Sequence, residues 1–337
     1  MTTESRTIGR LLRQRSVQIT AALWVLGSAT VFLLAADGLP IQRGHHPETA
    51  SGAVISGQIN LVLPLILVAV TLALTRRRPR IDLAQRSPEP TVARRETYTL
   101  IGYGVLVGIG GLMIGKLAGE HAYSLHLPGT IYGLHGETLH AGWVAGWVAY
   151  NLIGFAVIPY LVFRRRGYTT TQLSLRSSDR RGDAVLIVVI LAIETVAELG
   201  GLSSAIFDLS ARDLLIGIPL AFTVNFFGTV LPIMIFIYAI LLPRFARLTG
   251  SPATTAILGG VAYAVIHVFE SWAVYDTADA AVLTVILLFL QYLGPGIIKA
   301  VLTQRTGNAW VHVWAYHAIA PHVTIDTVNL LDSLRLR

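Results

Sequence analysis

The uninterrupted apolar stretch LLIGIPLAFTVNFFGTVLPIMIFIYAILLP, residues 214–243, decides the class of this fold. It contains no charged side chain, and it exceeds the roughly 20 residues that a helix needs to cross the hydrocarbon layer of a bilayer. Its Pro219, Gly228 and Pro232 predict a helix broken within the membrane, which is tolerated where the break faces protein or a cavity. Such a segment indicates an integral membrane protein.

The composition of the whole chain agrees with this assignment. Of its 337 residues, 53% are hydrophobic and 13% are charged, whereas soluble domains carry about 25% charged residues. So small a charged fraction cannot cover a water-facing surface, which excludes soluble, disordered and fibrous proteins. The chain contains no cysteine, so disulfides, thiolate zinc sites, iron–sulfur clusters and cysteine nucleophiles are excluded as well.

Apolar segments long enough to cross a bilayer recur along the sequence, and they predict the fold. A spanning helix needs about 20 apolar residues, and the chain has about nine such segments. We therefore predict an all-α polytopic membrane helix bundle with about eight or nine transmembrane helices. The segments are 17–36, 55–75, 98–116, 138–163, 184–206, 214–243, 253–270, 279–303 and 308–330.

Arginines gather in two of the connecting loops and set the expected orientation. Loops 76–97 and 164–182 are rich in arginine, whereas loop 37–54 has a single arginine and loop 271–278 has none. Because short loops rich in Lys and Arg stay in the cytoplasm, we expect the N-terminus and both Arg-rich loops on that side. Contact with anionic lipids of the bilayer is a secondary effect of these clusters. Their distribution also argues against nucleic acid as a partner, despite a net charge of +7.

The same two loops are the best candidates for internal boundaries. The 76–97 loop combines arginines with prolines, and the 164–182 loop separates the fourth apolar segment from the fifth. We predict an N-terminal membrane module of about four spans, residues 1–150, followed by a C-terminal intramembrane core, residues 151–330.

Ionisable side chains within the apolar segments mark the candidate site, because they are costly in a bilayer and are by default functional. Glu194 and Glu198 lie four residues apart, as do His322 and Asp326, so each pair shares one helix face. His317 lies five residues from each neighbouring histidine, which on an α-helix turns it about 140° away from both.

Histidines at membrane depth on two segments indicate a polar cavity between them. His267 belongs to the seventh segment, and His317 and His322 belong to the ninth. The simpler alternatives are hydrogen-bonded packing histidines and a structural pair of Glu194 with Glu198. A second polar group, near the outer ends of the third and fourth segments, has spacings that match no tight metal motif, and we interpret it as a solvated loop. It comprises Lys116, Glu120, His121, His126, His135, Glu137 and His140.

Three stretches of the second half resemble the CPBP family, the CAAX-protease and bacteriocin-processing intramembrane proteases, also called abortive-infection proteins. NLIGFAVIPYLVFRRRGYTTTQLSLRSSDRRGD (151–183) is similar to the family's entry helix and the Arg–Gly turn that follows it. LLPRFARLTGSPATTAILGGVAYAVIH (241–267) is similar to the connection leading to its FxxxH motif. GPGIIKAVLTQRTGNAWVHVWAYH (294–317) is similar to its Gly-containing helix, turn and final His motif. The resemblance implies a CPBP-like core and a bacterial plasma membrane.

The resemblance also implies a chemistry, in which a glutamate activates water and histidines from two later helices orient the reaction. His267 matches the histidine of the second motif. The paired glutamates of the family fall on Ile233 and Met234, and the arginine of that motif falls on Tyr238. In the last motif His317 stands near the expected place. The HxxxD pattern is formed by His322 and Asp326, about five residues later than expected.

The general base of the family mechanism is therefore missing from its own helix, and three hypotheses follow. The chain is a non-proteolytic membrane scaffold that binds a partner; or an acid from another helix replaces the lost pair; or a metal is bound. The candidate acids are Glu194, Glu198 and Glu270, of which Glu270 is disfavoured because it lies one turn outward of His267. In the last case His267, His317 and His322 are the expected ligands, and zinc is the expected ion. The expected function is cleavage or binding of a membrane-embedded or lipidated peptide, with His267, His317, His322, Asp326, Glu194 and Glu198 as the catalytic candidates.

Overall fold

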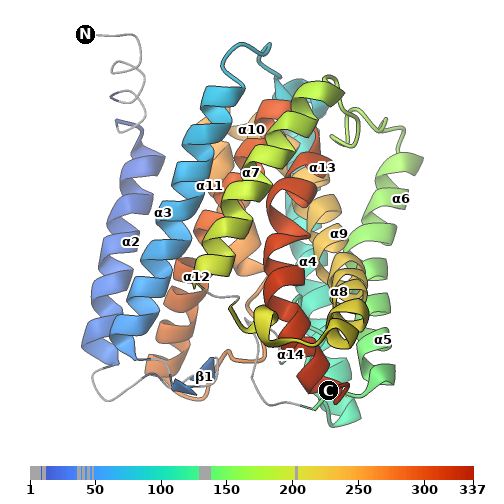
Figure 1. Ribbon diagram of the computed structural model, residues 1–337. Helices are drawn as coiled ribbons and strands as arrows, with labels where there is room; N and C mark the ends of the chain where they lie inside the picture. Colours follow the sequence, from blue (N-terminus) through green and yellow to red (C-terminus); the bar gives the residue numbers. More distant parts are fainter. Residues whose placement is uncertain are drawn as a thin grey trace.

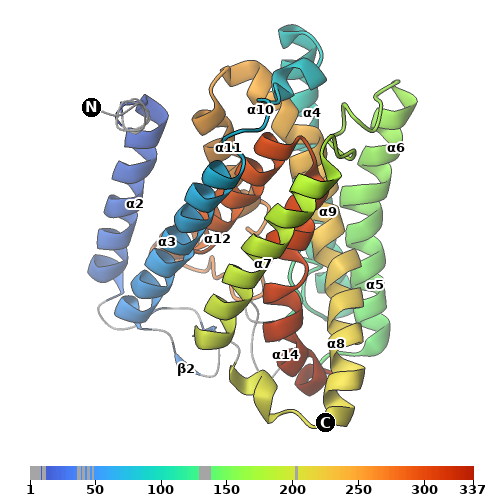
Figure 2. The ribbon, with the colours of Figure 1, turned by 45° about the horizontal axis from the view of Figure 1, so that its top comes forward.

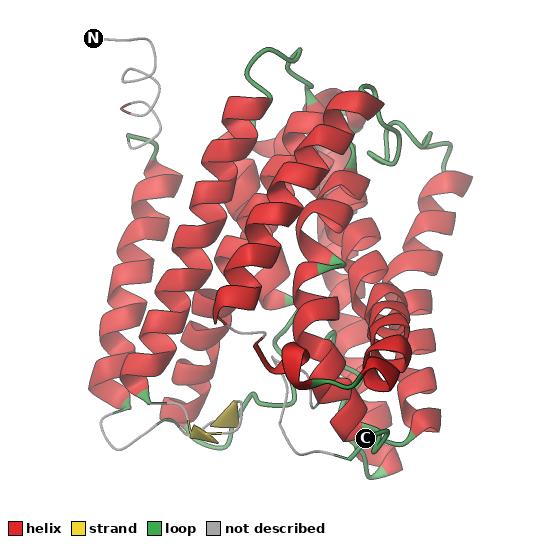
Figure 3. Cartoon of the chain, viewed as in Figure 1, coloured by secondary structure: helices red, strands yellow, loops and turns green. Residues whose placement is uncertain are grey.

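The computed structural model describes residues 13–35, 49–128, 138–201 and 204–337, together with residues 9, 39, 42, 43, 46 and 47. Within these residues the regular secondary structure is helical apart from one short antiparallel pair, β1 (Gln42–Arg43) and β2 (His46–Pro47). Figure 3 shows how completely helices dominate the fold. The predicted all-α class is confirmed.

Seven helices of the described residues are long and apolar enough to cross a membrane, as expected of an integral membrane protein. Four are regular: α2 (Arg15–Leu34), α3 (Ala50–Leu74), α4 (Pro90–Ala118) and α7 (Arg180–Gly201). A fifth is assembled from α5 (Ala141–Asn151), η2 (Leu152–Val157) and α6 (Ile158–Arg165), and the seventh is α12 (Ala278–Thr306). Short turns of 3-10 helix, η1 (Leu83–Arg86) and η3 (Ser204–Asp208), lie in the connections.

The sixth helix covers Ala211–Thr249 and contains the stretch that decided the fold class. It runs through α8 (Ala211–Asn225), η4 (Phe226–Val230), α9 (Leu231–Ile233), η5 (Met234–Leu241) and α10 (Leu242–Thr249). The helix is continuous, whereas a break was predicted at its glycine and prolines. The wider π-helical winding of η4 and η5 absorbs these residues, since π-bulges insert into α-helices without ending them.

Two of the predicted spans differ from the structure. The segment 253–270 forms α11 (Pro252–Val265), a helix of only 14 residues that ends in a series of turns. The segment 308–330 is divided into α13 (Ala309–His312), η6 (Val313–His317), η7 (Ala320–Ile325) and α14 (Asp326–Ser333). The number of long spanning helices among the described residues is therefore seven rather than eight or nine.

The centre of the bundle is formed by the Ala211–Thr249 helix and α12, whose residues are mostly buried. Figures 1 and 2 show α2 and α3 at one side of α12, and α5 with α6 at the far side of the molecule. The segment from α13 to α14 runs down the middle and contacts α7 and α8. Because α3 packs on α12, the predicted boundary at residue 150 does not separate the spans in space, and it stays a prediction about the sequence.

A close approach between α11 and α12 positions the candidate site. A Cβ added at Gly296 would lie 2.6 Å from the Cα of Gly260 and 2.8 Å from the Cβ of Tyr263. Small residues allow such contact between membrane helices. The C-terminal end of α11 therefore packs against the middle of α12, and His267 follows directly after this end.

Candidate functional site

Three fully buried side chains from two separate segments form the centre of the candidate site. The Nδ1 atom of His267 lies 2.7 Å from Oε1 of Glu270, and the Nδ1 atom of His126 lies 3.1 Å from the same oxygen. The two imidazole rings stack, with centroids 4.6 Å apart and planes 7° from parallel. One ligand atom of each residue lies within 4.8 Å of the others, so this group could hold a metal ion. We call it the His–His–Glu centre.

The ligand atoms are close enough together for a zinc ion to bind between them. Zinc binds imidazole nitrogen and carboxylate oxygen at about 2.0–2.2 Å, so ligand atoms in a tetrahedral site are separated by roughly 3.3 Å. The two separations to the Glu270 oxygen, 2.7 and 3.1 Å, are shorter than that value, and all ligand atoms lie within 4.8 Å of one another. Without an ion the same atoms form hydrogen bonds, so the geometry serves either state.

The turn after α11 brings His267 and Glu270 together. The amide of His267 donates to Ala264, and the amide of Glu270 donates to His267. This turn folds Glu270 back onto the imidazole three residues before it. The two residues are three apart in sequence and are in direct contact.

His126 is contributed by the non-helical segment that follows α4. The carbonyl of Ser124 accepts hydrogen bonds from Trp147 (2.6 Å) and Asn151 (2.8 Å), and Thr229 donates to the carbonyl of Leu125. Irregular backbone is tolerated at membrane depth only where protein satisfies its polar groups, and here side chains of α5 and η4 do so. The segment is buried, and the prediction of a solvated loop at His126 was wrong.

The centre lies at the middle of α12. The ring of Tyr292 stacks on His267 with centroids 4.1 Å apart and lies 5.7 Å from that of His126. Tyr292 is 14 residues from either end of α12, since 292 − 278 = 14 and 306 − 292 = 14. At 1.5 Å rise per residue, that is about 21 Å from each end of the helix. The His–His–Glu centre therefore lies near the mid-depth of a spanning helix.

A buried pair of the last segment adjoins the centre. The Nδ1 atom of His322 lies 2.7 Å from Oδ2 of Asp326, which confirms that these residues share a face. The ring of His322 has its centroid 5.7 Å from that of His126. An imidazole held by a carboxylate at Nδ1 keeps its Nε2 as a proton acceptor.

His317 lies beside His322, which corrects the prediction that it points away. Their ring centroids are 5.4 Å apart, and those of His312 and His317 are 6.0 Å apart. The 140° separation assumed α-helical winding. Here the winding is π-helical, and the amide of Ala318 bonds to Val313, five residues earlier, so residues five apart align.

Lys299 and the two glutamates of α7 complete the polar interior. Lys299 is fully buried, with its Nζ 3.6 Å from the centroid of Tyr263, a ring that in turn contacts His267 (4.8 Å). The charges of Glu194 and Lys299 act on each other, and Glu198 is close enough to Asp326 to be affected by it. Neither glutamate belongs to the His–His–Glu centre.

The sequence-predicted residues thus divide into two sets. Of the predicted zinc ligands, only His267 belongs to the metal-competent group found among the described residues. The ring of His322 is adjacent to that of His126, and the ring of His317 is adjacent to that of His322. His126 and Glu270 were missed as members of one site. The signal that could have identified His126 is its apolar setting, Leu125–His126–Leu127–Pro128, which is unlike a solvated loop. His135 and Glu137 lie outside the described residues.

An exposed loop borders the centre. The hydroxyl of Tyr275 donates to the carbonyl of Val268 (2.5 Å), and the side chain is 45% exposed. Burial of the ring, and after it the negative charge of Glu270, raise the pKa of Tyr275 to about 12. The negative charge of Glu270 therefore acts electrostatically on Tyr275 in the exposed 271–277 loop.

Core residues occupy the positions at which the sequence resemblance places a glutamate pair and an arginine. Ile233, Met234 and Tyr238 are completely buried. Tyr238 donates to the carbonyl of Gly296 (3.2 Å) and packs its ring 4.4 Å from that of His312.

No protein-family model, curated protein or solved structure matches this chain.

Proposed function

We propose that this chain is a metal-dependent hydrolase of the membrane interior, in which His126, His267 and Glu270 bind a zinc ion. The observation that carries the proposal is the convergence of two imidazoles and one carboxylate on a single buried point. Two histidines and a glutamate are a ligand set used by catalytic zinc sites, which keep the fourth position for water or substrate.

The neighbouring residues supply acid–base groups. A zinc ion at this position would act as a Lewis acid that polarises a substrate carbonyl and acidifies water. Asp326 holds His322 at Nδ1, so Nε2 of His322 is the general base. Water attacks the carbonyl carbon, its proton passes to this nitrogen, and the proton moves on to the leaving amine as the carbon–nitrogen bond breaks.

The substrate class follows from the location of the centre. A site near the mid-depth of α12 is reached by a peptide bond within the membrane, so we propose a membrane-embedded or lipidated peptide as substrate. The resemblance to intramembrane proteases supports the same class. It also supports a bacterial plasma membrane, with the Arg-rich loops in the cytoplasm.

Zinc would make the missing family glutamates unnecessary. In the CPBP mechanism the carboxylate pair activates water, and here Ile233 and Met234 occupy those positions. A metal held by Glu270 and two histidines performs the same task from another place in the bundle.

Metal analysis of the purified protein tests the proposal. The metal-free protein should bind one zinc ion per chain, and His126→Ala, His267→Ala and Glu270→Gln should each lose it. His317→Ala is the matched control, because it removes a buried imidazole from outside the His–His–Glu centre and should keep the ion.

A cleavage assay tests the hydrolase half of the proposal. A quenched fluorescent peptide that spans the bilayer should be cut in liposomes containing the zinc-loaded protein, and a chelator should stop the reaction. Failure to bind zinc would refute the proposal and identify the cluster as hydrogen-bonded structure in a membrane scaffold. Zinc binding without cleavage would refute the hydrolase alone.

A further inference from the structure

A hollow lies between the end of α3 and the start of α7, at the Arg-rich end of the bundle. Its volume is about 340 Å³, which is within the range of small-molecule sites, about 300–1,000 Å³. The wall combines two arginines, one aspartate and several apolar residues. The lining residues are Leu74, Arg78, Asp179, Arg181, Gly182, Val185 and Leu186.

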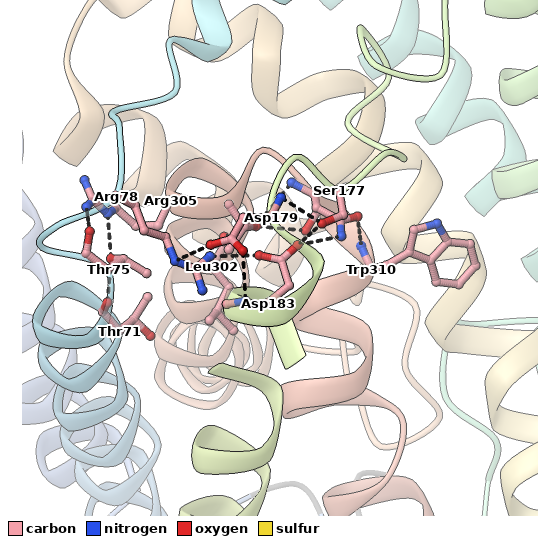
Figure 4. A network of polar contacts seen from close by, with 12 residues as sticks. Thr71, Thr75, Arg78, Ser177, Asp179, Asp183, Leu302, Arg305 and Trp310 are labelled. Carbon is pink, nitrogen blue, oxygen red and sulfur yellow. Dashed lines mark hydrogen bonds and ion pairs between the residues drawn. The ribbon is translucent and has the colours of Figure 1, made fainter. Parts of the chain in front are cut away.

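One of these arginines is held rigidly. The NH1 atom of Arg78 lies 2.8 Å from Oδ1 of Asp183, and its Nε lies 3.5 Å from Oδ2 of Asp179 (Figure 4). Asp183 also accepts hydrogen bonds from Ser177 (2.7 Å) and Asn308 (3.1 Å), which hold its carboxylate in place. A cation fixed in this way loses little side-chain entropy when it binds a ligand.

Cationic groups outnumber the carboxylates around the hollow. Arg181 is exposed and forms no ion pair with another described residue. Arg305, anchored on the hydroxyl (2.9 Å) and carbonyl (2.7 Å) of Thr75, feels the charges of Arg78 and Arg80. The planar guanidinium group matches phosphate oxygens in a bidentate manner, so an anion with this geometry is the favoured ligand.

The apolar part of the wall places the hollow at the surface of the bilayer. Leu74, the last residue of α3, is 43% exposed, and Val185, in the second turn of α7, is 53% exposed. Both belong to spanning helices, and the arginines begin directly beyond them. Lipid headgroups lie at this level, and basic pockets between transmembrane helices bind them.

We infer that this hollow binds the phosphate group of an anionic phospholipid. Arg181 and the edge of Arg78 that faces the hollow contact the phosphate oxygens. Leu74 and Val185 contact the start of the acyl chains. The site is independent of the His–His–Glu centre and of the hydrolase proposed for it.

Lipid titration of the full-length protein tests this inference. The delipidated protein in neutral detergent is titrated with phosphatidylglycerol, with phosphatidylcholine or with inorganic phosphate, and the melting temperature is followed. Phosphatidylglycerol should raise it at concentrations where the other two do not. Arg181→Gln should weaken the apparent affinity for phosphatidylglycerol about fivefold, the effect of about one interfacial basic residue.

Two further variants keep the test decisive. Arg165→Gln, at the exposed end of α6, makes the same change of charge away from the hollow and should leave the affinity unchanged. Gly182→Ala keeps every charge but places a Cβ against Arg78 and Asp179, so it should reduce binding while the circular dichroism spectrum is retained.

Three results would overturn the inference. Equal effects of phosphatidylcholine and phosphatidylglycerol would exclude recognition of the anionic headgroup. An equal shift with inorganic phosphate would identify a simple anion site. Equal losses in Arg165→Gln and Arg181→Gln would reduce the effect to the general positive charge of this face.

Discussion

Replacing Glu270 by glutamine separates a metal ligand from a structural hydrogen-bond acceptor. The change keeps the size of the side chain and one oxygen. It removes the negative charge from the group that forms hydrogen bonds with His126 and His267. Hydrogen bonds to charged groups contribute about 1.5–3 kcal/mol and neutral ones about 0.5–1.5 kcal/mol. The buried carboxylate also carries a desolvation cost that the amide avoids. We therefore expect the metal-free variant to be destabilised by less than about 2 kcal/mol.

Glu270→Gln should reduce the stability of the zinc-loaded protein much more than that of the metal-free protein. A ligand at 100 times its Kd stabilises the fold by about 2.7 kcal/mol, which for a chain of this length corresponds to about 4 °C in Tm. Loss of a ligand weakens affinity at least as much as loss of an outer-shell partner, about 10- to 100-fold. At the same zinc concentration the variant then gains about 1.4 to 0.4 kcal/mol, or about 2 °C to under 1 °C.

Thermal unfolding in detergent measures the stability of the metal-free variant, and repeating it with zinc measures the zinc-dependent shift in Tm. Glu198→Gln is the matched control, because it removes a carboxylate of α7 that lies outside the His–His–Glu centre, and it should retain the full zinc-dependent shift. A Glu270→Gln protein that keeps the full shift would refute the assignment of Glu270 as a ligand. A wild-type protein with no zinc-dependent shift would refute the centre itself.

Three other substitutions test the interior. Lys299→Met should destabilise the protein by about 1–2 kcal/mol, because it removes the amino group that lies over the ring of Tyr263; combined with Glu194→Gln it should cost less than the sum of the two single effects, since the charges of the two groups act on each other, and additive effects in the double-mutant cycle would contradict the coupling. Gly228→Ala should cost about 1–3 kcal/mol in unfolding experiments, since the new Cβ collides with the ring of Trp147, and an unchanged Tm would show that the helices separate freely. Ile233→Glu places a carboxylate at a fully buried position where the resemblance to the CPBP family expects one. It should lower the yield of folded protein in size-exclusion chromatography without creating chelator-resistant peptidase activity, and a stable, active variant would favour a glutamate mechanism.

The spanning helices could be predicted from the sequence because their signal is local. Length and apolar composition are sufficient for α2, α3 and α4, and neither depends on what the helix contacts. Hydropathy could not show that 253–270 stops after 14 residues as α11, because the closing turns are stabilised by packing against α12.

The candidate site was predictable where its residues are close in sequence. The spacing of four between His322 and Asp326 is sufficient to predict their contact. His126 is different, since its burial depends on hydrogen bonds from Trp147, Asn151 and Thr229, which are 21 to 103 residues further along the chain (147 − 126 = 21, 229 − 126 = 103). No local pattern can reveal a histidine that is made intramembrane by distant partners.

Departures from the α-helix are what bring the ionisable side chains together. His126 lies on a non-helical segment, and His267 and Glu270 lie in the turns after α11. His317 and His322 belong to the π-helical segments η6 and η7. A regular α-helix presents residues five apart on different faces, so an unbroken ninth span would have pointed these imidazoles in different directions. Pro321 opposes that regular winding, because it lacks the amide that would bond to the carbonyl of His317 four residues earlier. The irregular backbone thus helps to create the polar interior, and π-helical turns within α-helices occur frequently at functional sites.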